Sequence, residues 1–434
     1  MDRHPIGNGA CTPRIPREVA ALIAALQLKG GNTEALGELK QQEWESLLQF
    51  CDLAHLTLSL AQVESSRFPS WVIERLKRNR ADNAARFERV RHAYQEAAAA
   101  LDRSGIDHIV LKGFTQSPEY VVDPYLRVQS DLDIYCPREM IAQARTGLEQ
   151  IGYQSEQARA SISRADHLPA LIRIGDWQWR GNAFDPDMPL SIELHFCFWN
   201  EDVSWFFVPE ADSFWDRRIN RSLEGMSFPA LNRVDHLGYL ALHILRDLLI
   251  GDWIIHHVHE LARFLHGHAR DDEFWKEWSE THSDSFRALQ ALAFYHARTW
   301  FFCDVHPAVQ NEIATLPTIH RKWLEYFVGS ALEGMFRKNK DRVWLHASLV
   351  KSARKKVALI WKTIVPTRKQ LSPIDSPAVG IKNRQSKEAR FSNRYFRYAA
   401  YMVDRTIAHA RPVPSLMWHG LILWWSQRQF RRQF

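Results

Sequence analysis

The chain has 434 residues, of which 46% are hydrophobic and 24% are charged. This composition is typical of a globular protein, and the length allows two or three domains. The five cysteines are odd in number and widely spaced, which argues against a disulfide framework or a cysteine zinc site. The N-terminal region lacks a signal-peptide pattern, and no apolar run is long enough to span a membrane. We therefore expect a protein of the reducing cytoplasm.

Charge is distributed unevenly along the chain. Residues 351–434 contain 18 Lys and Arg against 3 Asp and Glu, whereas the preceding residues contain 38 against 47. A basic tail after an acidic body suggests an anionic partner for the tail: nucleic acid, an anionic membrane surface or the body itself. A solvated surface without a partner is the alternative. The Trp, Leu and Arg pattern of Leu416–Arg432 fits an interfacial helix, a helix docked on the body, or nucleic-acid stacking.

The N-terminal quarter of the chain predicts helices. Residues 1–16 read as a loose end, and the apolar residues of Arg17–Phe68 recur at helical spacing. Ser70–Arg103, rich in Ala, Arg and Glu, predicts one longer helix, and the Ser104-Gly105 pair predicts its end.

The next segment changes to a strand pattern. Ile106–Leu111 predicts a short strand, which Lys112-Gly113 interrupts, and Phe114–Tyr120 predicts one or two helical turns. Asp131–Cys136 alternates between polar and apolar residues and predicts a second strand. Pro137, in the position that proline favours, is expected to begin a helix that reaches about Ile151.

Three further strands are predicted, at Ala170–Ile174, Trp177–Trp179 and Leu190–Phe196. From Asp235 onward the pattern is helical again. Gln370–Asn393, rich in Ser, Pro, Lys and Arg, is the best candidate for a linker.

Two aspartates on the second strand predict a metal site. Asp131 and Asp133 are two residues apart, so both side chains point to the same face of the strand. Carboxylates this close repel each other and favour protonation unless a cation lies between them. Mg²⁺ bound by one or two carboxylates and by substrate phosphates would resolve this repulsion. Upstream, Lys112 offers a positive charge and Gly113 permits a close approach of the backbone to a phosphate.

Glu193 is the third candidate carboxylate. It shares a face with Ser191 and His195, while the apolar residues Ile192 and Leu194 occupy the other face. If its strand lies beside the aspartate strand, Glu193 completes a site for two metal ions and accepts the proton of an acceptor hydroxyl.

These segments, taken in order, resemble a known family. The matching segments are Ile109–Gly113, Tyr120, Pro124, Arg127, Asp131–Ile134, Ile192–His195, His236, His243 and the stretch from position 253 to Leu265. Together they resemble the uncharacterised bacterial nucleotidyltransferases of the polymerase-beta-like superfamily, over roughly Ala98 to Leu265. The wider superfamily usually has Gly-Ser at the phosphate turn, where this chain has Lys112-Gly113-Phe114-Thr115. Glu260 stands where the family often has Asp.

The resemblance implies a nucleoside triphosphate (NTP, for example ATP) as substrate and two Mg²⁺ ions as cofactors. It assigns Asp131 and Asp133 to metal and triphosphate, and Glu193 to the second metal and to acceptor activation. It assigns Lys112 and Gly113 to phosphate contact.

We therefore expect an α+β protein, in which a small mixed β-sheet nucleotidyltransferase core is flanked by helices and the C-terminal half is mostly helical. The expected regions are a helical segment at 17–104, the core at 105–232, a helical domain at 233–350 and a basic extension at 351–434. The expected function is Mg²⁺-dependent transfer of a nucleoside monophosphate (NMP) to a hydroxyl-bearing acceptor, which is a small molecule, a sugar or a protein. The alternative is a catalytically inactive form of the fold that binds or scaffolds a partner.

Two nearby side chains have open roles. Arg127 either contacts the triphosphate, which makes it a nucleotide-binding residue, or pairs with Asp131, or is an ordinary surface arginine. His195, on the same face as Glu193, either orients that carboxylate without binding the metal itself or is a packed or water-bonded histidine.

Farther along, a histidine-rich stretch invites a metal-site interpretation. It contains His256, His257, His259, His266 and His268. No acidic ligand set with the spacing of a known zinc motif accompanies them, so no metal site is expected there. Asp247 and Asp252 are expected to be solvated or to cap helices.

Overall fold

The computed structural model describes residues 13–64, 66–155, 166–252, 254–337, 339–365, 406–407 and 410–430. Most of the predicted loose N-terminal end and the whole predicted linker, Gln370–Asn393, lie outside these residues. The chain divides into two compact units, one from Ile15 to Leu316 and one formed by the residues before and after it. Each unit is described by itself.

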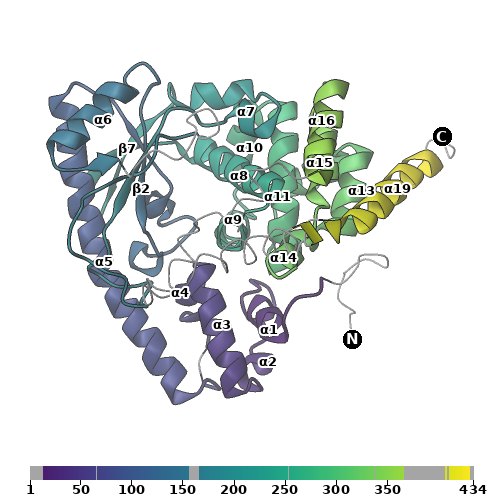
Figure 1. Ribbon diagram of the computed structural model, residues 1–434, viewed down its shortest axis with the longest axis horizontal. Coiled ribbons are helices and arrows are strands. Elements are labelled where there is room, and N and C mark those ends of the chain that lie inside the picture. Colours follow the sequence, from purple (N-terminus) through teal and green to yellow (C-terminus); the bar gives the residue numbers. More distant parts are fainter. Residues whose placement is uncertain are drawn as a thin grey trace, which may run out of the picture. The chain divides into compact units, whose positions relative to one another are not determined.

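The helices that precede the sheet match the prediction. They are α1 (Arg17–Ala25), α2 (Glu34–Gly37), α3 (Gln41–Leu53), α4 (Thr57–Leu60) and α5 (Ser70–Arg103). Helix α5 has the predicted bounds at both ends and is the longest helix in Figure 1. Its buried residues Val90, Tyr94 and Leu101 recur at helical spacing and form the stripe that covers the sheet.

The unit from Ile15 to Leu316 contains one mixed sheet, which lies between α5 and α6 (Ile141–Gln150) on one side and α8 (Arg233–Ile250) on the other (Figure 1). Its seven strands have the order β3-β4-β5-β2-β1-β7-β6. Their bounds are β1 Ile109–Leu111, β2 Asp131–Tyr135, β3 Gln154–Ser155, β4 Leu171–Ile172, β5 Ser191–His195, β6 Ile219–Leu223 and β7 Met226–Ala230. β2 is parallel to β5 and β1 is parallel to β7, whereas the other pairs are antiparallel. The predicted α+β class with a mixed sheet is confirmed.

Two local predictions were wrong. Trp177–Trp179 is not a strand; the segment is irregular, and the Trp177 indole donates to Asp185 Oδ2 at 3.0 Å. Helix α6 begins at Ile141, because Pro137 instead closes a turn in which Met140 N donates to Pro137 O at 2.9 Å.

The hairpin of β6 and β7 was not predicted. Its two-residue turn, Glu224-Gly225, has φ of 47° and 74°, the left-handed backbone typical of tight hairpins. Alternating residues around a turn that contains glycine are a signal that could have predicted this hairpin.

One face of the sheet is covered by α5 and α6 (Ile141–Gln150). The apolar side chains of β2 and β5, namely Leu132, Ile134, Ile192 and Leu194, are fully buried in this core. Because strand residues alternate between faces, the acidic residues between them must point to the opposite face.

Helices dominate the remainder of this unit, as predicted from Asp235 onward. The longer ones are α8 (Arg233–Ile250), α9 (Ile255–Gly267), α10 (Asp272–Thr281), α11 (Asp284–Phe301) and α12 (Pro307–Thr315). Short elements are η1 (Gly113–Gln116), η2 (Pro124–Leu126), α7 (Glu201–Ser204) and η4 (Pro209–Phe214). Helices α8 and α9 both pack against α11, which fixes their position next to each other.

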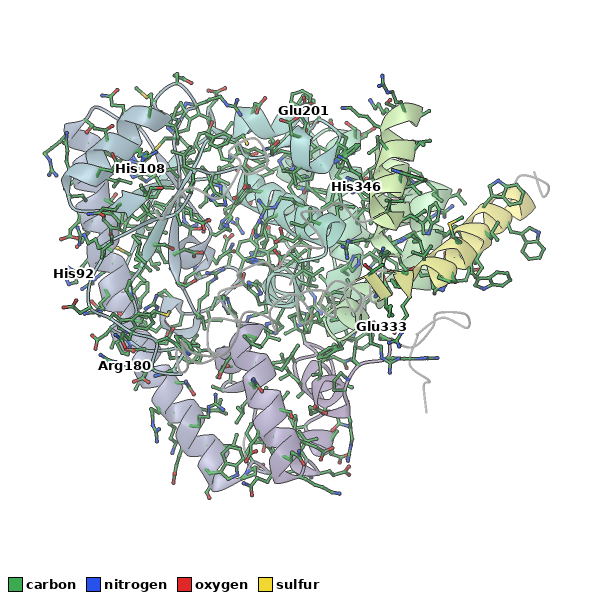
Figure 2. All side chains as sticks on the ribbon, viewed as in Figure 1. His92, His108, Arg180, Glu201, Glu333 and His346 are labelled. Carbon is green, nitrogen blue, oxygen red and sulfur yellow. The ribbon has the colours of Figure 1, made fainter. Side chains whose placement is uncertain are left out.

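The second unit is helical where it is described. It contains α13 (Thr318–Phe327), α14 (Ser330–Gly334), α15 (Arg342–Leu349), α16 (Ala353–Ile364) and α19 (Val413–Phe430). Helix α19 packs against α13. Its Leu416 and Leu423 are buried, whereas Trp418 and Trp425 are more than 60% exposed. Figure 2 shows large side chains that project outward from this helix. Among the described helices, none combines the length and the apolar character needed to cross a membrane. An anionic partner for the basic tail stays a prediction.

Candidate active site

The parallel pair of β2 and β5 places two predicted site residues side by side. Asp133 is the register partner of Glu193, and Asp131 is the partner of Ser191. Asp133 is 3% exposed, whereas Asp131 and Glu193 are half-buried. Donor atoms of Asp133, Glu193 and His195 all lie within 4.8 Å of one another. The strand pairing therefore brings carboxylates from distant parts of the sequence into one cluster.

Asp133 lies between two nitrogen groups. Lys112 Nζ and His195 Nε2 each lie 2.8 Å from its Oδ1 atom. Burial would raise the pKa of Asp133, but the Lys112 ammonium and the His195 hydrogen bond hold it well below its usual value. Burial likewise opposes the charge of Lys112, yet Asp133 raises the Lys112 pKa above its usual value. Both groups are therefore ionised at neutral pH, and a positive charge already lies against the carboxylate cluster.

Asp131 experiences the opposite environment. Burial, followed by the negative charges of Asp133 and Glu193, raises its pKa to about 7, although Lys112 partly offsets this effect. One ammonium is thus insufficient to neutralise the carboxylates on this face. The cluster is electrostatically suited to an additional cation.

These side chains border a cavity of about 420 Å³ in the unit from Ile15 to Leu316. Asp131 and Asp133 line it on the side of the sheet, together with Lys112 and Arg127. Other lining residues come from helices α8 and α9 and include His243, Arg246, Asp247, His256 and His257. Glu193 is not among the described lining residues; its Oε2 lies 3.9 Å from His195 Nε2. The cavity thus joins an acidic wall to a wall rich in cations and histidine.

The Lys112-Gly113 turn has an unusual backbone. Both residues have positive φ, 50° for Lys112 and 55° for Gly113. A Cβ on Gly113 would lie 2.3 Å from Nε2, the side-chain amide nitrogen of Gln129. That nitrogen donates to the Asp131 carbonyl at 2.8 Å. The absence of a side chain at Gly113 thus lets Gln129 reach the backbone of the first aspartate.

Gly113→Ala is expected to destabilise the protein by about 2 kcal/mol, because alanine opposes a positive φ and would displace Gln129. Urea unfolding measures this change. Gly175→Ala, at a glycine with ordinary φ and no atom within 4 Å of an added Cβ, is the matched control and should change stability by less than about 0.5 kcal/mol. Equal stability of the two variants would contradict this account of the turn.

Arg127 is held by an acidic partner on α9. Its Nε lies 2.7 Å from Glu260 Oε1, and Glu260 is 6% exposed. Burial opposes the charge of Glu260, but Arg127 lowers its pKa to about 2. Arg127 also lines the cavity, and its charge lowers the pKa of Asp131. The guanidinium is therefore fixed beside the acidic wall through a partner other than the predicted Asp131.

Two buried polar residues of α5 position the segment that enters β2, and neither was predicted from the sequence. Asn83 Nδ2 donates to the Tyr125 and Arg127 carbonyls at 2.7 and 3.1 Å. Arg86, 2% exposed, donates to the carbonyls of Gln129 and Met188 at 2.8 and 2.9 Å. A polar residue within the buried stripe of a long helix was the signal available in the sequence.

Arg86→Met is expected to lower the free energy of unfolding by about 2 kcal/mol, since it leaves buried carbonyls without their donor. Thermal or urea unfolding tests this directly. The control is Arg89→Met, which replaces the same residue type about one helix turn farther along α5. The Arg89 side chain is 54% exposed and pairs with Asp187. Loss of the Arg89–Asp187 ion pair should lower the free energy of unfolding by less than about 1 kcal/mol. The account is wrong if the Arg89 variant is the less stable of the two.

The helical wall contains further ionisable groups that were not predicted as site residues. Asp247 was expected to be solvated or capping, but it is only 6% exposed and pairs with Arg246 and His243. Arg246 also pairs closely with Asp166, whose Oδ2 lies 3.8 Å from His195 Nδ1. Burial and Arg246 lower the pKa of His243 well below its usual value, so its imidazole is neutral. Asp252 is exposed, as expected.

Comparison with known proteins identifies the family. No curated protein and no solved structure gives a significant match. A family described as uncharacterised nucleotidyltransferase matches residues 40–302, which is more than half of the chain. The match includes the sheet, the carboxylate cluster and helices α8 to α11. The chain therefore belongs to the uncharacterised nucleotidyltransferase family.

Proposed function

We propose that the protein transfers NMP from an NTP to a hydroxyl-bearing acceptor, with two Mg²⁺ ions held by Asp131, Asp133 and Glu193. The observation that carries this proposal is the register pairing of Asp133 with Glu193, next to a cavity that Asp131, Asp133, Lys112 and Arg127 line. Family membership supports nucleotidyl transfer in general. The acceptor and the use of two metal ions are inferences from the site.

The donor set fits Mg²⁺. The three carboxylates offer oxygen ligands, which Mg²⁺ prefers. The raised pKa of Asp131, about 7, reflects negative charge that a divalent cation would neutralise. Bound Mg²⁺ would stabilise the charge that develops on the attacking and leaving oxygens.

The basic residues of the cavity are suited to the triphosphate. Lys112 is 13% exposed on its side chain and is held at the carboxylate cluster by Asp133. Arg127 is fixed by Glu260, so little conformational freedom is lost when it binds a phosphate oxygen. Gly113, without a side chain, allows a phosphate to approach the turn closely.

Glu193 is the proposed general base. Its side chain is 23% exposed, more than that of Asp133, and it lies at the same cluster. In the proposed step Glu193 accepts the proton of the acceptor hydroxyl, whose oxygen attacks the α-phosphorus. The bond from the α-phosphorus to the bridging oxygen breaks, and pyrophosphate leaves with its electron pair. His195 holds Asp133 in position through its Nε2.

The experiment uses the full-length protein, Mg²⁺, a cell extract as the source of acceptors, and each NTP labelled either at the α- or at the γ-phosphorus. We expect transfer of the α label only, and the preferred NTP identifies the base. Transfer of the γ label would instead indicate a kinase and would overturn the proposal. Absence of transfer from every NTP would favour the catalytically inactive binding fold.

A further inference from the structure

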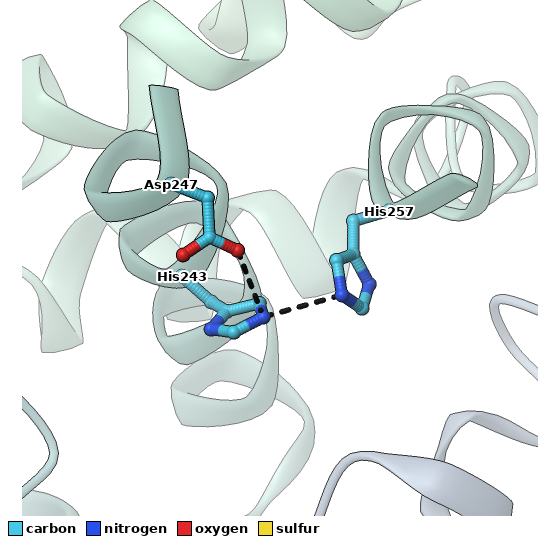
Figure 3. Close-up of side chains that lie close together, drawn as sticks. All are labelled: His243, Asp247 and His257. Carbon is cyan, nitrogen blue, oxygen red and sulfur yellow. Dashed lines mark hydrogen bonds and ion pairs between the residues drawn. The ribbon is translucent and has the colours of Figure 1, made fainter. Parts of the chain in front are cut away.

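A second cluster of potential metal ligands lies in the helical wall of the cavity. His243 and Asp247 are four residues apart on α8 and point to the same side, and His257 reaches them from α9 (Figure 3). His243 Nε2 lies 3.2 Å from His257 Nε2 and 3.2 Å from Asp247 Oδ2. All three donor atoms lie within 4.8 Å of one another. The side chains are buried, with 6–7% exposure.

This spacing fits a single small cation. In tetrahedral zinc sites the metal–nitrogen and metal–oxygen distances of about 2.0–2.2 Å place neighbouring ligand atoms about 3.3 Å apart. The two distances of 3.2 Å match that value. Because one nitrogen is close to both other donors, an ion at their centre requires little movement of the side chains.

The ligand types separate this cluster from the carboxylate site. Two imidazoles and one carboxylate suit Zn²⁺ and related transition metals, whereas Mg²⁺ prefers oxygen ligands. We propose that His243, Asp247 and His257 bind one divalent transition-metal ion, with Zn²⁺ as the representative ion. This site does not depend on the proposed nucleotidyl transfer.

The outer contacts of two ligands are those expected of a metal site. His257 Nδ1 lies 3.3 Å from Glu260 Oε2, so it can donate its hydrogen there and leave Nε2 free for the ion. Asp247 uses Oδ1 to accept from Arg246 Nε at 2.9 Å and keeps Oδ2 toward the histidines. Such contacts orient ligands and raise metal affinity.

His243 makes a contact that must change when the ion binds. Arg246 Nη2 lies 3.0 Å from His243 Nδ1, and a guanidinium can only donate, so Nδ1 is the acceptor and Nε2 carries the hydrogen. Coordination through Nε2 moves that hydrogen to Nδ1. Arg246 must then release His243, while its Nη1 group remains paired with Asp166. Metal binding should therefore change the tautomer of His243 without net loss of its proton and shift Arg246 toward Asp166 and Asp247.

A fourth ligand would reach the bound ion from the cavity. All three proposed ligands line it, as do Arg246 and His256. Water or an anionic ligand in the cavity can complete the coordination, which is the arrangement of zinc sites that retain one exchangeable position.

The test uses full-length protein treated with a chelator, without nucleotide and with excess Mg²⁺ to occupy oxygen-rich sites. Co²⁺, which has visible ligand-field absorption, is titrated and then displaced with Zn²⁺. We expect one equivalent of Co²⁺ per chain, with loss of the absorption in His243→Ala, Asp247→Asn and His257→Ala. The control is His266→Ala. His266 lies on α9, as His257 does, but outside the cluster, so this variant should bind Co²⁺ as the wild type does. Asp133→Asn should also bind normally, which separates this site from the proposed catalytic one.

A milder variant guards against loss of folding. Glu260→Gln keeps a hydrogen-bond acceptor for His257 but removes the charge, and it should weaken Co²⁺ binding by about 10- to 100-fold. Circular dichroism checks the fold of each variant. Failure of the folded wild type to bind Co²⁺ would overturn the proposal. The same holds if the folded His243 and His257 variants bind as tightly as the wild type.

Discussion

Asp133→Asn is expected to lower the rate of nucleotidyl transfer about 1,000-fold, which corresponds to about 4 kcal/mol of transition-state stabilisation. Asp133 is the residue that Lys112, His195 and Glu193 all approach, so its charge organises the site. Asparagine has a similar shape but neither binds Mg²⁺ as strongly nor holds the Lys112 ammonium. Initial rates of transfer of the α label to the acceptor measure the effect.

The matched control for this variant is Asp107→Asn. Asp107 precedes β1, its side chain is 75% exposed, and it pairs with Arg218 rather than with any cavity residue. Its rate should stay within about twofold of the wild type. Circular dichroism of Asp133→Asn checks that the fold is intact. A folded Asp133 variant with more than a tenth of the wild-type rate would remove Asp133 from the catalytic machinery.

Asp131→Asn is expected to stabilise the metal-free protein by about 4 kcal/mol at pH 8. The pKa of Asp131 is raised from 3.8 to about 7 in the folded protein, chiefly by burial and by Asp133. Above pH 7 both folded and unfolded chains carry the charge, and the folded state bears its full cost. Between pH 7 and pH 4 the folded state takes up a proton that the unfolded chain does not, so the cost decreases. The advantage of the variant should therefore vanish as pH falls toward 4.

Urea unfolding with a chelator present, between pH 4 and pH 8, tests this sign. Asp102→Asn, an exposed residue of α5, is the control and should change stability by less than about 0.5 kcal/mol at every pH. Saturating Mg²⁺ should stabilise the wild type and reduce the difference from the variant. A variant less stable than the wild type at pH 8 would show that Asp131 is well accommodated without a cation.

Local sequence patterns determined the elements that carry the predicted site. The alternation of Asp131–Cys136 and of Leu190–Phe196 predicted two strands with acidic residues on one face, because strand periodicity is a local property. The Ala, Arg and Glu content of Ser70–Arg103, with the Ser104-Gly105 pair after it, likewise predicted α5 at both ends. The strand predicted at Trp177–Trp179 was wrong because the pattern there is short. The segment has residues typical of a strand, but the Trp177 indole donates a hydrogen bond to Asp185 instead.

Pairing across the chain was decided by the tertiary structure. Asp133 meets Glu193 because β2 and β5 are parallel neighbours, and no local pattern states which strands become adjacent. The same reason explains why Arg86 was missed, since its carbonyl partners lie 43 and 102 residues away in the sequence.

The proposed metal site of His243, Asp247 and His257 shows the same division. His243 and Asp247 share a helical face that the sequence makes visible, but His257 joins them only because α8 and α9 both pack against α11. Burial of the α8 and α9 side chains also made Asp247 a structural partner rather than a solvated group. The sequence by itself thus determined which residue types lie on which face of each element. The tertiary structure decided which faces meet, because contacts between distant segments depend on the packing of the whole core.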